Sequence, residues 1–239
     1  MHIMTIAKYF VNLFYPLRCS ACKEDLNPLS KTGVCGFCAA SIRRNPRPYC
    51  GICGRPVNHD GDTCSECAKL DLRFDRAYSA CLYEDRVKEL IHKLKYGSGS
   101  SLINFFSGIM MDFLKDNREI TQGVEAITYV PLDRARMRER GFNQSRLLAR
   151  RIARQLDIPL INAIKKISRT RHQNELSREE RLINLRVAFK ARKGIDLNGK
   201  VIMLVDDIMT TGATLSECSK ALRNSGVKEI RCLTLARGI

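Results

Sequence analysis

Residues 201–214 read VIMLVDDIMTTGAT, and this stretch decides the fold class of the 239-residue chain. Its first five residues are all apolar, which predicts a strand buried on both faces of a sheet. Asp206 and Asp207 follow at the end of that strand, where open α/β sheets bind their ligands. Small residues, hydroxyls and backbone N–H groups then lead into a helix, whose N-terminus favours a phosphate dianion. The residues of this phosphate loop are Thr210, Thr211, Gly212, Ala213 and Thr214.

This order of groups suits a ribose 5-phosphate. The phosphate loop would hold the 5-phosphate, while Asp206 and Asp207 would take the two ribose hydroxyls, directly or through a bound Mg2+. The stretch is not a Walker loop, because no Gly-Lys-Thr/Ser sequence follows its glycine. The simpler alternative is that the acids only cap the next helix, but capping uses one carboxylate and leaves the second unexplained.

Strand and helix patterns alternate on the N-terminal side of this stretch and continue after it. Apolar periodicity and helix boundaries define these segments. We expect strands at residues 77–83, 126–130, 158–161, 201–205 and 228–236. We expect helices at residues 3–15, through 87–94, and at 102–114, 143–156, 177–184 and 214–224. The alternation predicts an α/β fold with a mainly parallel sheet, flanking helices and right-handed crossovers.

Eight of the eleven cysteines lie in the first 67 residues, as four Cys-x-x-Cys pairs. Such pairs supply the thiolates of tetrahedral zinc sites, and eight ligands are enough for two structural Zn2+ ions. The gaps of twelve and ten residues between pairs suit two consecutive ribbon-like sites, although a cross-braced pairing stays open. The ligands would be Cys19, Cys22, Cys35, Cys38, Cys50, Cys53, Cys64 and Cys67.

A disulfide framework is the alternative for these cysteines, and it requires a secreted chain. The N-terminus has no basic leader region, and Lys8 and Asn12 interrupt its apolar stretch. No run of about 18 apolar residues could span a membrane. We therefore expect a cytoplasmic protein with reduced, metal-binding thiols. Cys81, Cys218 and Cys232 stand in apolar surroundings and are predicted to be core residues.

The cysteine-rich segment defines a predicted domain boundary. Residues 1–70 hold the N-terminal helix and the double zinc region, which has too little apolar content to form a core without metal. Residues 71–239 form the α/β domain.

The chain carries a net charge of +16, and much of it is concentrated after residue 133. Residues 134–154 contain eight arginines and one acid, and residues 134–181 have a net charge of +9. A sugar phosphate could use two or three of these charges, whereas a nucleic-acid backbone could use most of them. We therefore predict sequence-independent binding of nucleic acid, single-stranded DNA first, with RNA and protein partners left open. The predicted stripe is Arg136, Arg138, Arg140, Arg146, Arg150, Arg151 and Arg154.

Residues 205–214 resemble the phosphoribosyl pyrophosphate (PRPP) motif of type I phosphoribosyltransferases. Together with the cysteine pairs and residues 140–144, RGFNQ, they make the whole chain similar to the ComF family, a competence-protein and amidophosphoribosyltransferase-like group. A third stretch also resembles the family, and the matching residues are Gln173, Leu176, Arg181, Asn184, Ala188 and Phe189.

The resemblance implies a type I phosphoribosyltransferase-like fold that binds PRPP with Mg2+. It also implies single-stranded DNA binding in DNA uptake and competence. Helicase or DNA-transport partners at the inner face of the cytoplasmic membrane belong to the same expectation. Pro131, Leu132 and Asp133 fall where the family's pyrophosphate loop lies, and Arg171, Gln173 and Arg178 fall in its mobile loop.

One position departs from related enzymes. Those that act on 6-oxopurines place an acid three residues after the second acid of the motif, and here that position is Thr210. Two alternatives to a binding protein therefore stay open. One is an active phosphoribosyltransferase with a small amine or nucleobase acceptor, and the other is a zinc-stabilised adaptor without catalysis.

Overall fold

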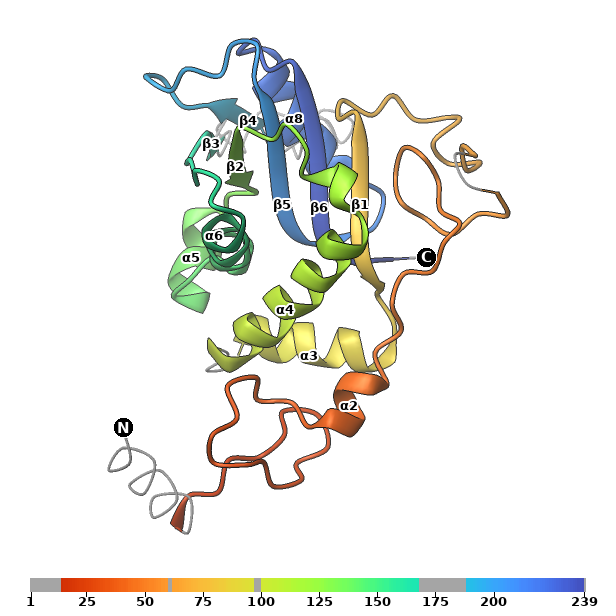
Figure 1. Ribbon diagram of the computed structural model, residues 1–239. Coiled ribbons are helices and arrows are strands. Elements are labelled where there is room, and N and C mark those ends of the chain that lie inside the picture. The colour runs from red at the N-terminus through yellow and green to blue at the C-terminus, as the bar shows by residue number, and fades with distance from the viewer. Residues whose placement is uncertain (1–13, 60–61, 97–99, 168–187, 239) are drawn as a thin grey trace, which may run out of the picture.

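The computed structural model describes residues 14–59, 62–96, 100–167 and 188–238, and it is built around one parallel sheet (Figure 1). The strand order is β1-β6-β5-β2, and all three strand pairs are parallel. The strands are β1 Arg76–Leu82, β2 Ala126–Tyr129, β5 Val201–Met209 and β6 Glu229–Arg237. The predicted α/β class with a parallel sheet is confirmed.

Strand β5 extends four residues further than its apolar run predicts. Its pairing with β2 ends at Tyr129 and Val205, but its pairing with β6 continues to Met209 and Arg237. Asp206 and Asp207 therefore lie inside the strand, beyond the end of β2, and not after the strand as expected. The shorter neighbour leaves this end of β5 open on one side, and the candidate site forms there.

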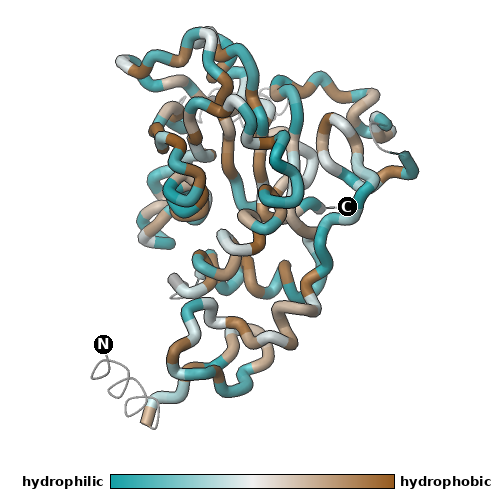
Figure 2. Tube along the Cα trace, in the orientation of Figure 1, coloured by the Kyte–Doolittle hydropathy of each residue, from teal (hydrophilic) through white to brown (hydrophobic). Residues whose placement is uncertain are grey.

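The two faces of the sheet pack into two separate hydrophobic clusters. On one face, Met203 and Val205 pack with helices α3 Asp85–Tyr96, α4 Ser100–Asp116 and α6 Gln144–Leu156. On the other face, Ile202 and Leu204 pack with helix α8 Ala213–Arg223. Figure 2 shows the resulting apolar centre between more polar outer segments. The continuous apolar run of β5 is thus buried on both faces, as predicted.

Four predicted helices are present in the described residues as α3, α4, α6 and α8. The apolar positions of the α3 pattern, Val87, Leu90, Ile91 and Leu94, are all buried. Helix α6 begins after Asn143, whose side chain accepts a hydrogen bond from the N–H of Arg146 at 3.1 Å. That bond satisfies one of the free N–H groups of the first turn and fixes where the helix starts.

Several short elements differ from the expectation. The predicted strand at 158–161 is not formed: this segment pairs with β2 only through an isolated bridge between Leu160 and Ile127. The structure adds helices α2 Gly36–Ala40 and α5 Arg134–Arg140, the 3-10 turn η1 Arg118–Ile120, and an antiparallel pair of β3 Ile164–Ile167 with β4 Ala188–Ala191. The predicted helix at 177–184 and most of that at 3–15 lie outside the described residues.

The two cysteine regions lie against different parts of the sheet domain (Figure 1). The first shares the hydrophobic cluster of α3 and α4, and the second shares the cluster of α8. The three remaining cysteines, Cys81, Cys218 and Cys232, are fully buried, as predicted for core residues. In the described ranges, no helix combines the length and apolar character needed to cross a membrane.

Candidate functional site

Two four-cysteine clusters form from pairs that are consecutive in the sequence. Their sulfur atoms lie within 4.8 Å of one another in each cluster, and none forms a disulfide. The consecutive pairing is therefore the one present, and the cross-braced alternative and the disulfide framework are excluded. The first cluster is Cys19, Cys22, Cys35 and Cys38, and the second is Cys50, Cys53, Cys64 and Cys67.

One thiol in each cluster is held near its ionised form. Burial raises the pKa of Cys19, but backbone N–H groups, first that of Cys35 at 3.3 Å, outweigh it and lower the pKa to about 6. Cys50 repeats this arrangement with the N–H of Cys64 at 3.4 Å, and its pKa falls to about 7. The four sulfur atoms of each cluster lie close enough together to bind one ion, so both clusters fit a structural Zn2+ with four thiolate ligands.

A cleft of about 900 Å3 opens at the end of β5, between the start of α8 and the helix α5. It is lined by both acids of the motif and by most of the phosphate loop. The same cleft is reached by Pro131 and Leu132, and by the basic side chains of Lys95, Arg136, Arg140 and Lys166. The structure thus brings together segments that lie more than 100 residues apart in the chain.

The two acids are almost fully buried and differ in their partners. Asp206 accepts a hydrogen bond from the Ser145 hydroxyl at 2.7 Å and from the N–H of Asp207 at 2.9 Å. Asp207 forms an ion pair with Lys95 at 2.8 Å and accepts a longer bond from Gln144 at 3.4 Å. Helix α3 therefore neutralises one acid, while the other relies on neutral donors.

Burial raises the pKa of Asp206 well above its usual range, and the neighbouring charge of Asp207 raises it further. A carboxylate in this position is costly without a cation or several donors beside it. Two adjacent carboxylates at a cleft wall supply the oxygen ligands that Mg2+ prefers. The donor set of Asp206 and Asp207 therefore fits Mg2+ together with sugar hydroxyls.

Within the phosphate loop, Gly212 directly precedes helix α8 and has a φ of +81°. The N-cap residue Gly212 has no side chain that could accept from the first turn, so N–H groups of this turn could donate to an anion. Thr211 turns its hydroxyl oxygen toward the N–H of Ala213 at 3.4 Å. The predicted helix start is thus confirmed within one residue, and four of the five loop residues line the cleft: Thr210, Thr211, Ala213 and Thr214.

Gly212 gives a test of how tightly the loop is held. A Cβ added there would lie 2.8 Å from Cε of Met209, and a φ of +81° strains any other residue. We expect Gly212→Ala to lower the free energy of unfolding by about 2 kcal/mol, measured by urea denaturation. The control is Gly123→Ala, which has a φ of +73° but open space around it, and should cost only about 1 kcal/mol. Equal losses would show that Met209 does not press on the loop.

The three residues of the expected pyrophosphate loop have different positions in the structure. Pro131 and Leu132 line the cleft, whereas Asp133 caps α5 by accepting from the N–H of Arg136 at 2.8 Å. Asp133 also pairs with Lys166 at 3.0 Å. These contacts, first the backbone bond, lower the pKa of Asp133 to about 2. The side chain of Asp133 thus fixes the start of α5, and with it the position of the basic residues beyond.

Sequence reasoning missed Lys95 and Lys166 as basic residues of the cleft, and it assigned Arg136 and Arg140 to the nucleic-acid stripe. Lys95 is the penultimate residue of α3, and only the packing of that helix against the sheet brings it to Asp207. Arg140 is half-buried, 5.2 Å over the ring of Tyr96, and its Nη1 donates to Gln144 at 3.4 Å. The sequence did contain a signal for the short helix α5 that carries Arg140, namely Asp133 as its N-cap and Gly141 as its C-cap.

The predicted arginine stripe separates into two groups. Arg136 and Arg140 line the cleft. The other five are exposed and form no ion pair within the described part of the chain. On α6, Arg146, Arg150 and Arg154 lie opposite the buried Leu148 and Ile152, with Arg151 beside them, and Arg138 is on α5. We call these five the arginine surface: Arg138, Arg146, Arg150, Arg151 and Arg154. The mobile-loop residues Arg171, Gln173 and Arg178 lie outside the described residues.

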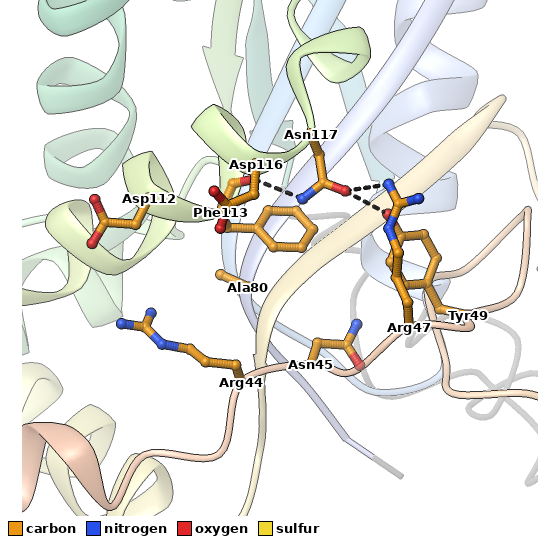
Figure 3. Close-up of a pocket in the computed structure, with 9 residues that line it drawn as sticks. All are labelled: Arg44, Asn45, Arg47, Tyr49, Ala80, Asp112, Phe113, Asp116 and Asn117. Atoms are coloured by element: carbon orange, nitrogen blue, oxygen red, sulfur yellow. Dashed lines mark hydrogen bonds between the residues drawn. The ribbon is translucent and has the colours of Figure 1, made fainter.

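A second, smaller cavity of about 460 Å3 lies between the segment that joins the two cysteine regions and the end of α4 (Figure 3). There, Asn117 accepts hydrogen bonds from Arg47 and, at 3.0 Å, from the hydroxyl of Tyr49. Asp112 and Asp116 also line it, together with the basic side chains of Arg44 and Arg47. Its hydrogen bonds tie the joining segment to the sheet domain.

Comparison with known proteins agrees with this architecture. Residues 143–239 match the family described as Phosphoribosyl transferase domain, and residues 10–68 match the Double zinc ribbon domain. The chain is 34% identical over 228 residues to Competence protein F of Haemophilus influenzae, covering 94% of this chain and 98% of that protein. It is 29% identical to DNA utilization protein YhgH of Escherichia coli K12, with 94% and 99% coverage.

Among solved structures, the glutamine phosphoribosylpyrophosphate amidotransferase from B. subtilis matches 59% of this chain and 30% of its own, with 22% identity and a TM-score of 0.40. The full-length match to Competence protein F, the double zinc ribbon and the phosphoribosyltransferase domain together place the chain: it belongs to the ComF family.

Proposed function

We propose that the cleft binds PRPP with Mg2+, and that the arginine surface binds single-stranded DNA in support of DNA uptake or use. The observation that carries the first part is the convergence on one cleft of a buried acid pair, an uncapped helix N-terminus and four basic side chains. Relatives named for competence and for DNA utilization support the second part.

The arrangement of the cleft suits each part of PRPP separately. The 5-phosphate would accept hydrogen bonds from N–H groups at the start of α8, where the helix dipole also favours an anion. The ribose hydroxyls would face Asp206 and Asp207, which would also hold Mg2+. The diphosphate would lie toward Pro131 and Leu132, with Lys95 and Arg136 available to balance its charge.

Titration calorimetry tests the first part. PRPP should bind only with Mg2+ present, and ribose 5-phosphate should bind more weakly because it lacks the diphosphate. No heat of binding with millimolar PRPP and Mg2+ would refute the proposal. A coupled assay for released pyrophosphate, with nucleobases and amines as acceptors, shows in the same preparation whether binding leads to transfer.

The arginine surface suits a polyanion better than a small anion. Arg146, Arg150 and Arg154 recur at every fourth position of α6, so they project from one side of the helix in a row. The absence of acidic partners for them in the described ranges leaves their charge available to phosphates. Contacts of this kind carry no base information, so binding should be independent of sequence.

The double variant Arg146→Glu with Arg150→Glu tests this surface. We expect weaker binding to single-stranded DNA, and a log–log salt slope reduced by about 0.7 for each phosphate that the variant no longer binds, or about 1.4 in all. Fluorescence anisotropy at several salt concentrations measures both. The control is Arg192→Glu with Lys193→Glu, which makes the same change in net charge at exposed positions away from α6. An equal effect of both variants would show that only net charge matters.

A further inference from the structure

Arg237, in the last strand, is a fully buried arginine at the junction of the cleft and the second cysteine cluster. It is 1% exposed. Its Nη1 donates to the backbone carbonyls of Met209, at 3.1 Å, and of Thr210, the first residue of the phosphate loop. Its Nη2 donates to Sγ of Cys53 at 3.7 Å. One guanidinium therefore contacts both a cysteine ligand and the start of the phosphate loop.

The charge of the cluster explains why an arginine can be buried there. Four thiolates around a divalent ion leave two net negative charges, and a buried guanidinium is costly without such a partner. Among the described residues, Arg237 forms an ion pair with Glu66, but this carboxylate is 4.0 Å away and half exposed, so it contributes less than the buried sulfur of Cys53. The rigid fork of arginine can reach sulfur and carbonyl oxygens at once, which lysine cannot do with one nitrogen.

A second set of contacts joins the same region to the loop. The segment that leaves the second cluster passes over Gly212, where an added Cβ would lie 3.6 Å from the Phe74 ring and 3.7 Å from Leu72. The N–H of Arg73 donates to the hydroxyl of Ser216, in the first turn of α8, at 3.1 Å. Phe74 also shares a hydrophobic cluster with Met209. The phosphate loop thus packs against the segment that leaves the second cluster.

The first cluster packs elsewhere and provides an internal comparison. Its region lies against α3 and α4, where Lys93 donates from Nζ to the carbonyl of Ser20 at 2.6 Å. Loss of metal from the two clusters should therefore have different consequences, although their cysteine arrangements are alike.

We propose that Arg237 is a positioning residue through which the second cysteine cluster sets the conformation of the phosphate loop. The metal-loaded second cluster, and not the first, would then control affinity for a phosphate ester at the loop. The effect on affinity rests on the proposed function, whereas the effect on loop conformation does not.

Arg237→Gln and Arg237→Lys test the residue in the full chain with both metals bound. We expect amide hydrogen exchange at residues 210–216 to accelerate about tenfold or more in Arg237→Gln, and less in Arg237→Lys, because a charged donor to the carbonyls is removed or only partly kept. Exchange in α6 should stay unchanged. A merely structural role would accelerate exchange throughout the chain, and that outcome, or no change at residues 210–216, would overturn the proposal.

Removing one cluster at a time tests the coupling without altering Arg237. The second cluster is disrupted by Cys64→Ser together with Cys67→Ser, and the first by the matched pair Cys35→Ser together with Cys38→Ser. Metal analysis should give one zinc per chain for each double variant. Only the second-cluster variant should accelerate exchange at residues 210–216 and weaken Mg2+-dependent PRPP binding, by about tenfold. Equal exchange at the loop in both variants would refute the coupling. If PRPP binds to neither variant nor the wild-type chain, the proposed function fails, while the exchange data still decide the role of Arg237.

Discussion

Asp206→Asn and Asp207→Asn are each expected to lower the affinity for PRPP with Mg2+ about a hundredfold or more, measured by titration calorimetry. Each change removes a negative oxygen that would face the cation and a ribose hydroxyl, and a charge-assisted contact contributes about 1.5–3 kcal/mol. Asp112→Asn is the control, because this exposed acid lies on α4 at the second cavity. Affinity in either variant within a few-fold of wild type would show that the acid pair does not hold the ligand.

The same two variants should differ in stability without ligand. The pKa of Asp206 is raised by burial, so the unfolded chain loses this proton at a lower pH than the folded chain does. Its contribution to stability therefore falls as pH rises above about 4, the usual value of an aspartate. Asp206→Asn removes that loss, so the variant should be more stable than wild type at pH 7.5 but not at pH 4. Urea denaturation at both pH values measures the difference.

Asp207→Asn should do the opposite, since it leaves Lys95 without the partner that lies at 2.8 Å. We expect it to lower the free energy of unfolding at neutral pH by roughly 1–3 kcal/mol. The two substitutions would then have the same effect on ligand affinity and opposite effects on the free energy of unfolding at neutral pH. A destabilised Asp206→Asn variant at pH 7.5 would contradict the explanation given for its buried carboxyl.

Zinc removal should have the largest effect on the fold. Structural zinc contributes about 10–16 kcal/mol per site in small zinc domains, and both clusters here share hydrophobic clusters with the sheet. We expect two zinc ions per chain by elemental analysis. A strong chelator should lower the midpoint of thermal unfolding by more than about 10 °C, because about 1 kcal/mol shifts it by 2–4 °C in a chain of this size.

Cys218→Ala is the control for zinc content, because this cysteine is buried in the core outside both clusters. It should keep two zinc ions per chain even if its own cavity lowers stability somewhat. Fewer than two zinc ions in freshly purified reduced wild-type protein, or an unfolding midpoint that is insensitive to chelation, would contradict the assignment of the clusters.

The central strand and the clusters could be predicted from sequence because their signals are local. An apolar run before paired acids indicates β5, and cysteine spacing indicates the two clusters. The partners of these groups could not be predicted in the same way. Lys95 reaches Asp207, and Arg237 reaches Cys53, only through the packing of distant elements. Nothing near either basic residue marks it in the sequence.

The arginine stripe shows a further limit of reasoning from spacing. Arg136 and Arg140 belong to the same run of charge as Arg146, but α5 ends at Gly141 with a φ of +75°, and the chain changes direction there. Arginines from one run of charge therefore lie both in the cleft and on an exposed surface. The charge density of the sequence predicted an anionic partner. Only the fold separates the basic residues into those of the cleft and those of the arginine surface.

A crystal structure of the protein grown with PRPP and Mg2+ tests the central claim most directly. We predict the 5-phosphate at the N–H groups of residues 210–214, and the ribose hydroxyls and the cation against Asp206 and Asp207. Density for the ligand elsewhere, with the loop empty and both acids still held by Lys95 and Ser145, would contradict it.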